Sequence, residues 1–199
     1  MALSKRPAGG FSLIEVLVSI VVLSLGLLGM VGMLMTSVRS TSESASFTEA
    51  VNLVRELSEK ARVNKSVAVR NSRANPYLVD LKSTDALPGQ GDTCVGIDAA
   101  CDEASLAAWD MEQWVERARR ALPQAHVVVC FDDTVVSDEG DDFRYVWNCS
   151  DQGRHLVVKL GWVPRIGSED EMAQREPRIV MQLIPGHDYG DTESDGGSS

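Results

Sequence analysis

A long apolar run near the N-terminus constrains the fold of this chain more than any other feature. Residues 11–38 contain one charged side chain, Glu15. The first 25 of these residues would form a helix about 37 Å long, at about 1.5 Å per residue, and a bilayer core is about 30 Å thick. A carboxylate in that core costs about 2.5 kcal/mol or more unless it is paired. We therefore expect a membrane-spanning helix in which Glu15 has a positively charged partner.

An ordinary secretory signal peptide is the simplest alternative for such a run. Its apolar region is about 7–15 residues long and precedes a cleavage site of small residues. Here the run is longer, and the small pair Gly9-Gly10 comes before it. Cleavage after Gly10 would release a short basic leader and keep the membrane span. Phe11 would then be the new N-terminus and Glu15 the fifth residue.

The residues around this cleavage point resemble a known signal. Residues 10–18, Gly-Phe-Ser-Leu-Ile-Glu-Val-Leu-Val, are similar to the class III signal of type IV prepilins and their relatives. The resemblance implies cleavage after Gly10 by a prepilin peptidase, N-methylation of Phe11, and a helix that packs into the core of a helical filament. It also implies that the carboxylate of Glu15 meets the free amine of a neighbouring subunit during assembly. The positive end of a helix also favours a carboxylate at that position.

Two further stretches are similar to PilV-type minor pilins. Residues 18–30 are apolar and lead into Gly-Leu-Leu-Gly, and residues 106–123 follow a pair of cysteines and carry two tryptophans. I-type minor pseudopilins of type II secretion begin in a similar way, so that system stays open as an alternative. The resemblance favours a minor pilin of a type IV pilus that takes part in pilus assembly or initiation near the tip, supporting motility and adhesion.

The same resemblance implies partners and a location. The partners would be a prepilin peptidase, other minor pilins, the major pilin and a tip adhesin. The chain would first be a single-pass protein of the inner membrane, with its head in the periplasm, and would then join a pilus on the cell surface. Removing the leader would move the formal net charge from −10 to −12, because Lys5 and Arg6 leave with it. An acidic balance argues against nucleic acid as a partner.

These observations predict four parts. They are a leader over residues 1–10, a membrane and filament-core helix over residues 11–38, a head over residues 39–187, and a disordered tail over residues 188–199. Outside the membrane, roughly 160 residues remain, the size of one ordinary domain. The tail lacks apolar side chains that could be buried.

Four cysteines follow the apolar run, at Cys94, Cys101, Cys130 and Cys149. In an oxidising compartment an even number indicates two disulfides, and four cysteines allow three pairings. Nearness in sequence favours Cys94 with Cys101 and Cys130 with Cys149, and the second bond would join two neighbouring strands. Zinc is the alternative, but the chain has no Cys-x-x-Cys motif and no histidine at a recurring ligand spacing.

The segment after the apolar run continues as a helix. Residues 34–74 contain no Gly or Pro, and Phe47, Val51 and Val54 recur at a spacing that places them on one face. We expect one helix over residues 11–62.

Gly26, Gly29 and Gly32 interrupt this helix, and each costs about 1 kcal/mol relative to Ala. They would form either a region that bends when subunits pack, as the resemblance suggests, or a surface for close helix contacts in the membrane.

The rest of the head is expected to contain a second helix and a sheet. Residues 75–100 are rich in turn residues, and a helix should begin near Ser105 and end before Pro123. A meander of four strands then follows, at residues 127–131, 143–147, 155–163 and 178–184. An antiparallel sheet packed on a long helix gives an α+β head, which is also the pilin-like architecture that the resemblance implies.

The last two strands alternate between two faces. In the third strand, Leu156, Val158, Leu160 and Trp162 should face the core, and His155, Lys159 and Gly161 should face away from it. In the fourth, Ile179, Met181 and Leu183 should point inward.

The head has few residues that suggest catalysis. The histidines, His126, His155 and His187, follow no catalytic motif, and the chain has no Gly-x-Ser-x-Gly elbow and no phosphate loop. We expect no enzyme and no cofactor. Acidic residues crowd positions 132–142, but their spacing fits no EF-hand, so a solvated turn is favoured over a calcium site. A membrane-anchored adhesin or binding domain is the alternative from another class.

Overall fold

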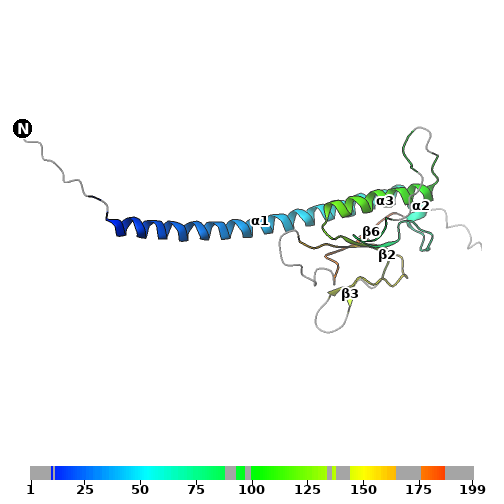
Figure 1. Cartoon of the computed structure of the whole chain (residues 1–199). Coiled ribbons are helices and arrows are strands. Elements are labelled where there is room, and N and C mark those ends of the chain that lie inside the picture. The colour runs from blue at the N-terminus through cyan, green and yellow to red at the C-terminus, as the bar shows by residue number, and fades with distance from the viewer. Residues whose placement is uncertain are drawn as a thin grey trace, which may run out of the picture. The chain divides into compact units, whose positions relative to one another are not determined.

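The structure is a computed structural model of the 199-residue chain. It describes residue 10 and residues 12–87, 93–96, 100–133, 136–137, 144–164 and 176–186. The chain divides into two compact units, Met1–Thr41 and Ser42–Ser199. Helix α1 (Leu13–Val63) begins in the first unit and ends in the second (Figure 1).

The first unit contains the apolar part of α1. The helix continues through the three glycines at positions 26, 29 and 32 without a break. Within the described residues, α1 is the helix that is long and apolar enough to cross a membrane, judged by length and composition alone. The predicted long N-terminal helix is confirmed.

The second unit contains an antiparallel sheet of four strands in the order β1-β2-β5-β6. The strands are β1 (Val79–Lys82), β2 (His126–Phe131), β5 (Leu156–Gly161) and β6 (Ile179–Leu183). A separate pair is formed by β3 (Val136–Ser137) and β4 (Arg144–Tyr145). The predicted α+β fold with an antiparallel sheet is therefore confirmed, but the membership of the sheet differs from the prediction.

Two segments differ from the predicted meander. Strand β1 lies in the segment predicted to be a connecting loop and pairs with β2, with Val79 opposite Val129. Its four residues bring few apolar side chains and follow turn residues, so the pattern was weak. The segment predicted as the second strand contributes β4, which pairs with β3 outside the main sheet. The carbonyl oxygens of Val146 and Asn148 are bound by Lys159 instead of by a neighbouring strand.

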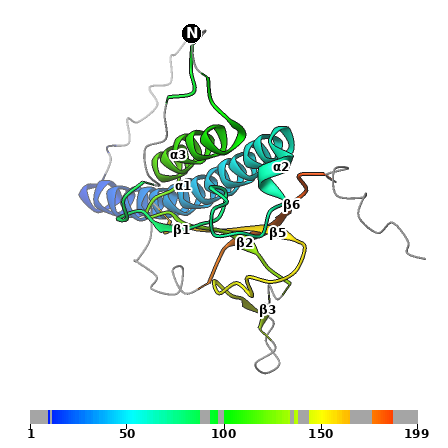
Figure 2. The ribbon, with the colours of Figure 1, turned by 90° about the vertical axis from the view of Figure 1, so that its right-hand side faces the viewer.

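Two helices cover one face of the sheet. Figure 2 shows α3 (Glu103–Ala121) beside the C-terminal part of α1 on one side of the strands, and β3 on the other side. The indole of Trp114, on α3, is fully buried and donates from Nε1 to the carbonyl oxygen of Leu53, on α1, at 2.8 Å. Short helix α2 (Lys65–Ala68) follows α1.

The buried stripe of α1 runs along positions spaced three and four apart: Ser46, Ala50, Leu53, Val54, Leu57 and Ala61. Of the predicted face, Val54 is buried, Val51 is half-buried and Phe47 is 38% exposed.

Polar contacts join the same layers. Lys60 pairs with Asp110 and Glu56 with Arg117, both between α1 and α3. The rings of Phe47, on α1, and Trp162, just after β5, pack in a T-shaped arrangement with centroids 4.8 Å apart. These contacts fix the part of α1 within the second unit to both α3 and the sheet.

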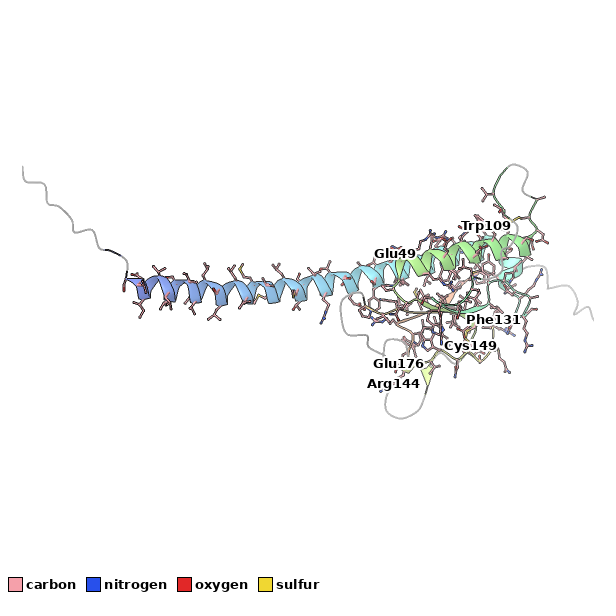
Figure 3. The ribbon with its side chains drawn as sticks, viewed as in Figure 1. Glu49, Trp109, Phe131, Arg144, Cys149 and Glu176 are labelled. Carbon is pink, nitrogen blue, oxygen red and sulfur yellow. A yellow bond between two sulfur atoms is a disulfide. The ribbon has the colours of Figure 1, made fainter. Side chains whose placement is uncertain are left out.

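The outer face of the sheet is also covered, contrary to the prediction. All residues of β5 are buried, including Lys159, which was expected to face away from the core. The segment between β4 and β5 lies over that face, as the disulfide of Cys149 with Cys130 shows. Arg144 Nη1 and Glu176 Oε1, 3.3 Å apart, also join β4 to the segment before β6 (Figure 3).

Strand β6 follows its prediction in part. Ile179 and Leu183 are buried, but Met181 is 38% exposed. In the described sheet β6 pairs with β5 alone, so its middle residue lies at the border of the core.

Candidate functional site

The predicted cleavage point lies just before α1. Gly10 is exposed and is not part of the helix, whereas Phe11 lies outside the described residues. The carbonyl oxygen of Ser12 accepts hydrogen bonds from the backbone N–H of Glu15 at 3.0 Å and of Val16 at 3.3 Å. The first turn of the helix therefore starts two residues after the bond that a peptidase would cut. Cleavage and methylation at Gly10 and Phe11 stay predictions.

Glu15 occupies the first turn of α1. The free N–H groups at a helix N-terminus carry partial positive charge, so a carboxylate is favoured there. Within the described part of the chain, no Lys, Arg or His forms an ion pair with Glu15, although many other carboxylates have such partners. The described residues thus supply no positively charged partner to this carboxylate.

Three hydroxyl groups of the apolar helix, those of Ser19, Ser24 and Thr36, are bound within the helix. Ser19 Oγ donates to the Glu15 carbonyl oxygen at 2.7 Å, and Ser24 Oγ donates to the Ile20 carbonyl oxygen at 2.7 Å. In an apolar medium an unbound hydroxyl would be costly, and these bonds remove that cost. Apart from Glu15, residues 12–38 therefore present a surface with no charge and few free polar atoms.

This surface is exposed along its length. Leu13 is 84% exposed, Leu28 is 70% exposed and Met33 is 77% exposed. A Cβ added at Gly26, Gly29 or Gly32 would have, apart from the neighbouring residues and backbone of its own helix, no described atom within 4 Å. Since exposed apolar patches of this extent mark interaction surfaces, the helix requires lipid or other apolar helices as neighbours.

The cysteines of the head form two disulfides. Cys94 is bonded to Cys101 with a Cα–Cα distance of 5.8 Å, and Cys130 to Cys149 with a Cα–Cα distance of 6.4 Å. These are the two pairs favoured in the sequence. Cys130 lies on β2, but Cys149 lies in the segment after β4 and outside any strand. The second bond therefore joins a strand to the segment that covers it.

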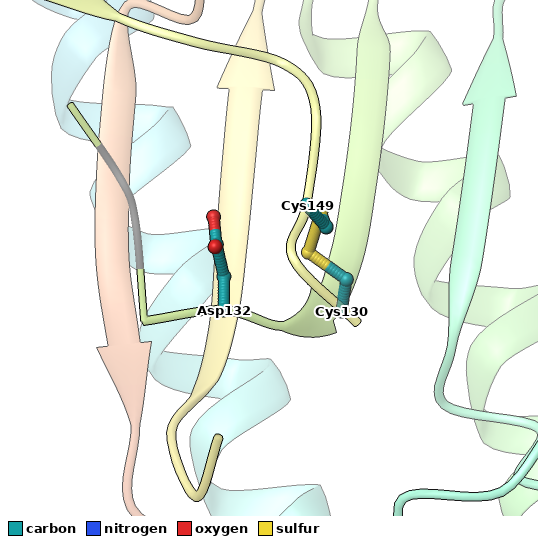
Figure 4. A group of neighbouring side chains, drawn as sticks. All are labelled: Cys130, Asp132 and Cys149. Atoms are coloured by element: carbon teal, nitrogen blue, oxygen red, sulfur yellow. A yellow bond between two sulfur atoms is a disulfide. The ribbon is translucent and has the colours of Figure 1, made fainter. Parts of the chain in front are cut away.

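One group of side chains has the composition of a metal site. The ligand atoms of Cys130, Asp132 and Cys149 lie within 4.8 Å of one another (Figure 4). Zinc is bound by thiolates, and both sulfur atoms here are consumed by the disulfide. Asp132 is bound to Lys159. The group therefore does not fit a metal centre.

Of the acidic positions considered for calcium, Asp133 is exposed, and Asp138, Glu139, Asp141 and Asp142 lie outside the described residues.

The described histidines have separate, structural surroundings. His126 Nε2 lies 2.8 Å from Asp80 Oδ1, and its ring stacks on Trp147 with centroids 3.8 Å apart. His155 Nδ1 lies 2.7 Å from Gln182 Nε2. His126 starts β2 and is opposite Gly161, the last residue of β5, whereas His155 precedes β5. The two rings thus lie at opposite ends of this strand pair and do not form a joint site. His187 lies outside the described residues.

The buried ion pair between Lys159 and Asp132 was not predicted from the sequence. Lys159 Nζ donates to Asp132 Oδ2 at 2.6 Å, and both side chains are 0% exposed. Lys159 also donates to the carbonyl oxygens of Val146 at 2.9 Å and Asn148 at 2.7 Å. The signal in the sequence was a single lysine within the apolar strand Leu-Val-Val-Lys-Leu-Gly. The alternation of the strand places it on the outer face, and only the tertiary structure covers that face.

Two family models match the chain. Residues 5–31 match the model described as the prokaryotic N-terminal methylation motif, and residues 32–112 match the model described as type IV pilin Tt1218. The matches adjoin, and together they cover more than half of the 199 residues. No curated protein and no solved structure matches the chain. The first match contains Gly10 and Glu15, and the second extends into α3.

Proposed function

This chain belongs to the type IV prepilin superfamily, and we propose that it acts within it as a minor pilin of a type IV pilus. The observation that carries the proposal is the exposed apolar helix that begins shortly after Gly10 and holds Glu15 in its first turn. Among the described residues, no Lys, Arg or His forms an ion pair with this carboxylate. A carboxylate in an apolar surface is stable when an opposite charge meets it. A filament of such helices supplies that charge, because each processed subunit begins with a free amine.

The proposed maturation has three steps. Prepilin peptidase cuts after Gly10 and releases residues 1–10, Phe11 is N-methylated, and residues 11–38 remain in the inner membrane. Residues 39–187 form the head on the periplasmic side, and residues 188–199, which lie outside the described residues, form a tail. The processed subunit then moves from the membrane into the pilus.

In the pilus the chain acts by packing, without catalytic turnover. Glu15 pairs with the N-terminal amine of a neighbouring subunit, and the apolar surface of α1 packs on the helices of other minor pilins and of the major pilin. Residues 16–38 carry no charge, and the hydroxyls of Ser19, Ser24 and Thr36 are bound within the helix, which supports this contact. A position at or near the tip, together with a tip adhesin, would link the subunit to pilus initiation, motility and attachment. The PilV-type features of the sequence support the minor role.

Two other functions make different predictions. An I-type minor pseudopilin would use the same helix in a type II secretion system. A membrane-anchored adhesin would bind a ligand through its head, where a cavity of about 290 Å³ lies between β5, β6 and β4. Its lining includes Asp133, Tyr145 and Gln182.

The test is the N-terminus of the protein in sheared surface filaments, read by intact mass and N-terminal sequencing. Wild-type chain should begin at methylated Phe11. Gly10→Val should abolish this processing, and Glu15→Ala should be processed normally but be depleted from filaments at least fivefold. Glu49→Ala is the matched control, because Glu49 is an exposed carboxylate of the same helix outside the apolar run. A start at Met1, or cleavage beyond residue 35, would contradict the proposal.

Deletion of the chain separates the alternatives. A minor pilin predicts fewer pili and reduced twitching with secretion unchanged, and a pseudopilin predicts the reverse. Normal pili with loss of attachment alone would support the adhesin and contradict a role in assembly.

A further inference from the structure

The segment that covers the outer face of the sheet is held by side chains, not by strand pairing. Between β4 and β5, residues 146–155 form no strand. Lys159 Nζ nevertheless binds the carbonyl oxygens of Val146 and Asn148, and Asp132 Oδ1 accepts from the backbone N–H of Ser150 at 3.1 Å. Cys149 lies between the last two of these anchored residues. The Lys159–Asp132 pair thus fixes the backbone on both sides of the cysteine.

Each N–H group of the Lys159 ammonium has a hydrogen-bond acceptor. Its three N–H groups meet one carboxylate oxygen and two carbonyl oxygens, and both charged side chains are fully buried. Buried ion pairs can often be replaced by apolar side chains of similar volume without loss of stability. An apolar side chain, however, cannot bind two carbonyl oxygens. The contribution that an apolar side chain could not make is therefore that Lys159 fixes the backbone of residues 146–150.

We propose that Lys159 is a positioning residue for formation of the Cys130–Cys149 disulfide. The ammonium, oriented by Asp132, holds residues 146–150 over the sheet. The sulfur of Cys149 thereby meets that of Cys130 on β2, and Figure 4 shows the bond between these two cysteines. This inference does not depend on the pilus as the final assembly. It depends only on oxidation of the folded head.

The chemistry is thiol–disulfide exchange with a disulfide oxidant, for example oxidised glutathione. One protein thiolate attacks a sulfur of the oxidant, which forms a mixed disulfide and releases one glutathione thiolate. The second protein thiolate then attacks the protein sulfur of the mixed disulfide and releases the second glutathione. Two electrons pass from the two cysteines to the oxidant, and two protons leave the cysteines. Lys159 affects the second step, since that step needs both sulfurs in contact.

The chain contains its own reference disulfide. Cys94 and Cys101 are 7 residues apart, whereas Cys130 and Cys149 are 19 residues apart. A longer loop has a larger entropy cost of closure, so the second pair gains more from an anchor. The hydrogen-bond partners given for Lys159 are Asp132, Val146 and Asn148, and none of them is near Cys94 or Cys101 in the sequence. The Cys94–Cys101 bond therefore serves as the internal reference.

The experiment follows each disulfide separately in the full chain. The protein is reduced and unfolded in detergent, refolded with oxidised glutathione, and sampled over time by differential alkylation and peptide mass spectrometry. Lys159→Met should slow closure of Cys130–Cys149 about tenfold or more and accumulate glutathione on one of the two cysteines. Closure of Cys94–Cys101 should keep its wild-type rate.

Lys60→Met is the matched control, because it removes another lysine–aspartate pair, with Asp110, on the opposite side of the sheet. It should leave closure of Cys130–Cys149 unchanged. A wild-type rate for this bond in Lys159→Met, or equal slowing of both bonds, would overturn the proposal.

A second variant separates positioning from folding. Asp132→Leu combined with Lys159→Met replaces the buried charges by an apolar pair, and near-ultraviolet circular dichroism reports whether the buried tryptophans keep their native packing. With native packing, the slow closure of Cys130–Cys149 should persist, because the carbonyl oxygens of Val146 and Asn148 still lack their donor. Recovery of the wild-type rate in this double variant would show that the ammonium is not required, and would refute the inference.

Discussion

At the scale of the residue, Tyr77 shows how one buried group links stability to pH. Its side chain is 0% exposed, and its hydroxyl donates to the carbonyl oxygen of Lys60 at 3.2 Å. Burial, and to a smaller extent the Asp110 carboxylate, raises the pKa of Tyr77 well above its ordinary value, although a hydrogen bond with Asn64 acts in the opposite direction. The folded protein therefore keeps the phenolic proton at pH values where the unfolded chain loses it.

Tyr77→Phe is expected to change the alkaline limb of the stability curve. In the wild type, the raised pKa of Tyr77 contributes its full share of the free energy of unfolding below about pH 10. Above that pH the contribution falls by up to about 1.4 kcal/mol per pH unit, because the unfolded state then binds fewer protons than the folded state. At pH 7 the variant should lose about 1 kcal/mol with the hydrogen bond. Above pH 10 the two proteins should converge. Urea unfolding from pH 7 to 11 measures this, with Tyr145→Phe as the control for loss of one tyrosine, and a constant difference would contradict it.

At the scale of the element, α3 begins with a capping residue. Asp102 has extended backbone angles, and its side chain accepts from the backbone N–H of Ser105 at 2.7 Å. This hydrogen bond satisfies one of the free donors at the start of the helix. The hydrogen bond from Ser105 also lowers the pKa of Asp102.

Asp102→Ala should destabilise the head at pH 7, and the loss should shrink as the solution becomes acidic. A carboxylate with a lowered pKa contributes stability above its ordinary pKa of about 3.9 and loses that contribution as pH falls through the folded value. Asp102→Asn is the matched variant, because Asn also caps helices but does not titrate. Guanidinium unfolding at pH 7 and pH 3 makes the comparison. Equal losses for Asp102→Ala at both pH values would argue against the carboxylate cap.

The two disulfides should stabilise the head unequally. The loop-entropy estimate gives about 3 kcal/mol for cysteines 19 residues apart and about 2 kcal/mol for cysteines 7 residues apart. Replacing Cys130 and Cys149 together by Ser should therefore cost more than replacing Cys94 and Cys101. Unfolding in guanidinium measures both free energies. A larger loss for the shorter loop would contradict the entropic argument.

At the scale of the whole molecule, the chain divides at residue 41, and the buried residues of α1 start at Ser46. The core of the head is therefore complete without the apolar run. We expect residues 42–199 to be produced without detergent, to form both disulfides and to unfold cooperatively. Residues 64–199 are the matched control, since they lack Leu53, Val54, Leu57 and Ala61, which line the core. Circular dichroism with thermal unfolding tests this, and aggregation of both fragments alike would contradict the prediction.

Much of the fold was readable in the sequence. The apolar run, the helical spacing of residues 47–61 and the stop at Pro123 predicted both long helices, because local pattern and capping decide where helices form. Strand β1 was missed because a short edge strand has few residues to show a pattern. Residues 143–147 were predicted as a strand of the main sheet. Residues 144–145 form β4, which pairs with β3, and the carbonyl oxygen of Val146 binds Lys159 instead of a neighbouring strand.

Three properties follow from the amino-acid sequence alone: a helix that needs an apolar environment, the position of its carboxylate, and an antiparallel head with two disulfides. These properties depend on hydrophobic run length, periodicity and composition, which are local. The cover on the outer face of the sheet does not follow from local sequence, because it depends on contacts between residues that are distant in the chain. The alternation of its strand predicts Lys159 as a surface residue. It is fully buried because the Asp132 carboxylate and the carbonyl oxygens of Val146 and Asn148 accept its three hydrogen bonds.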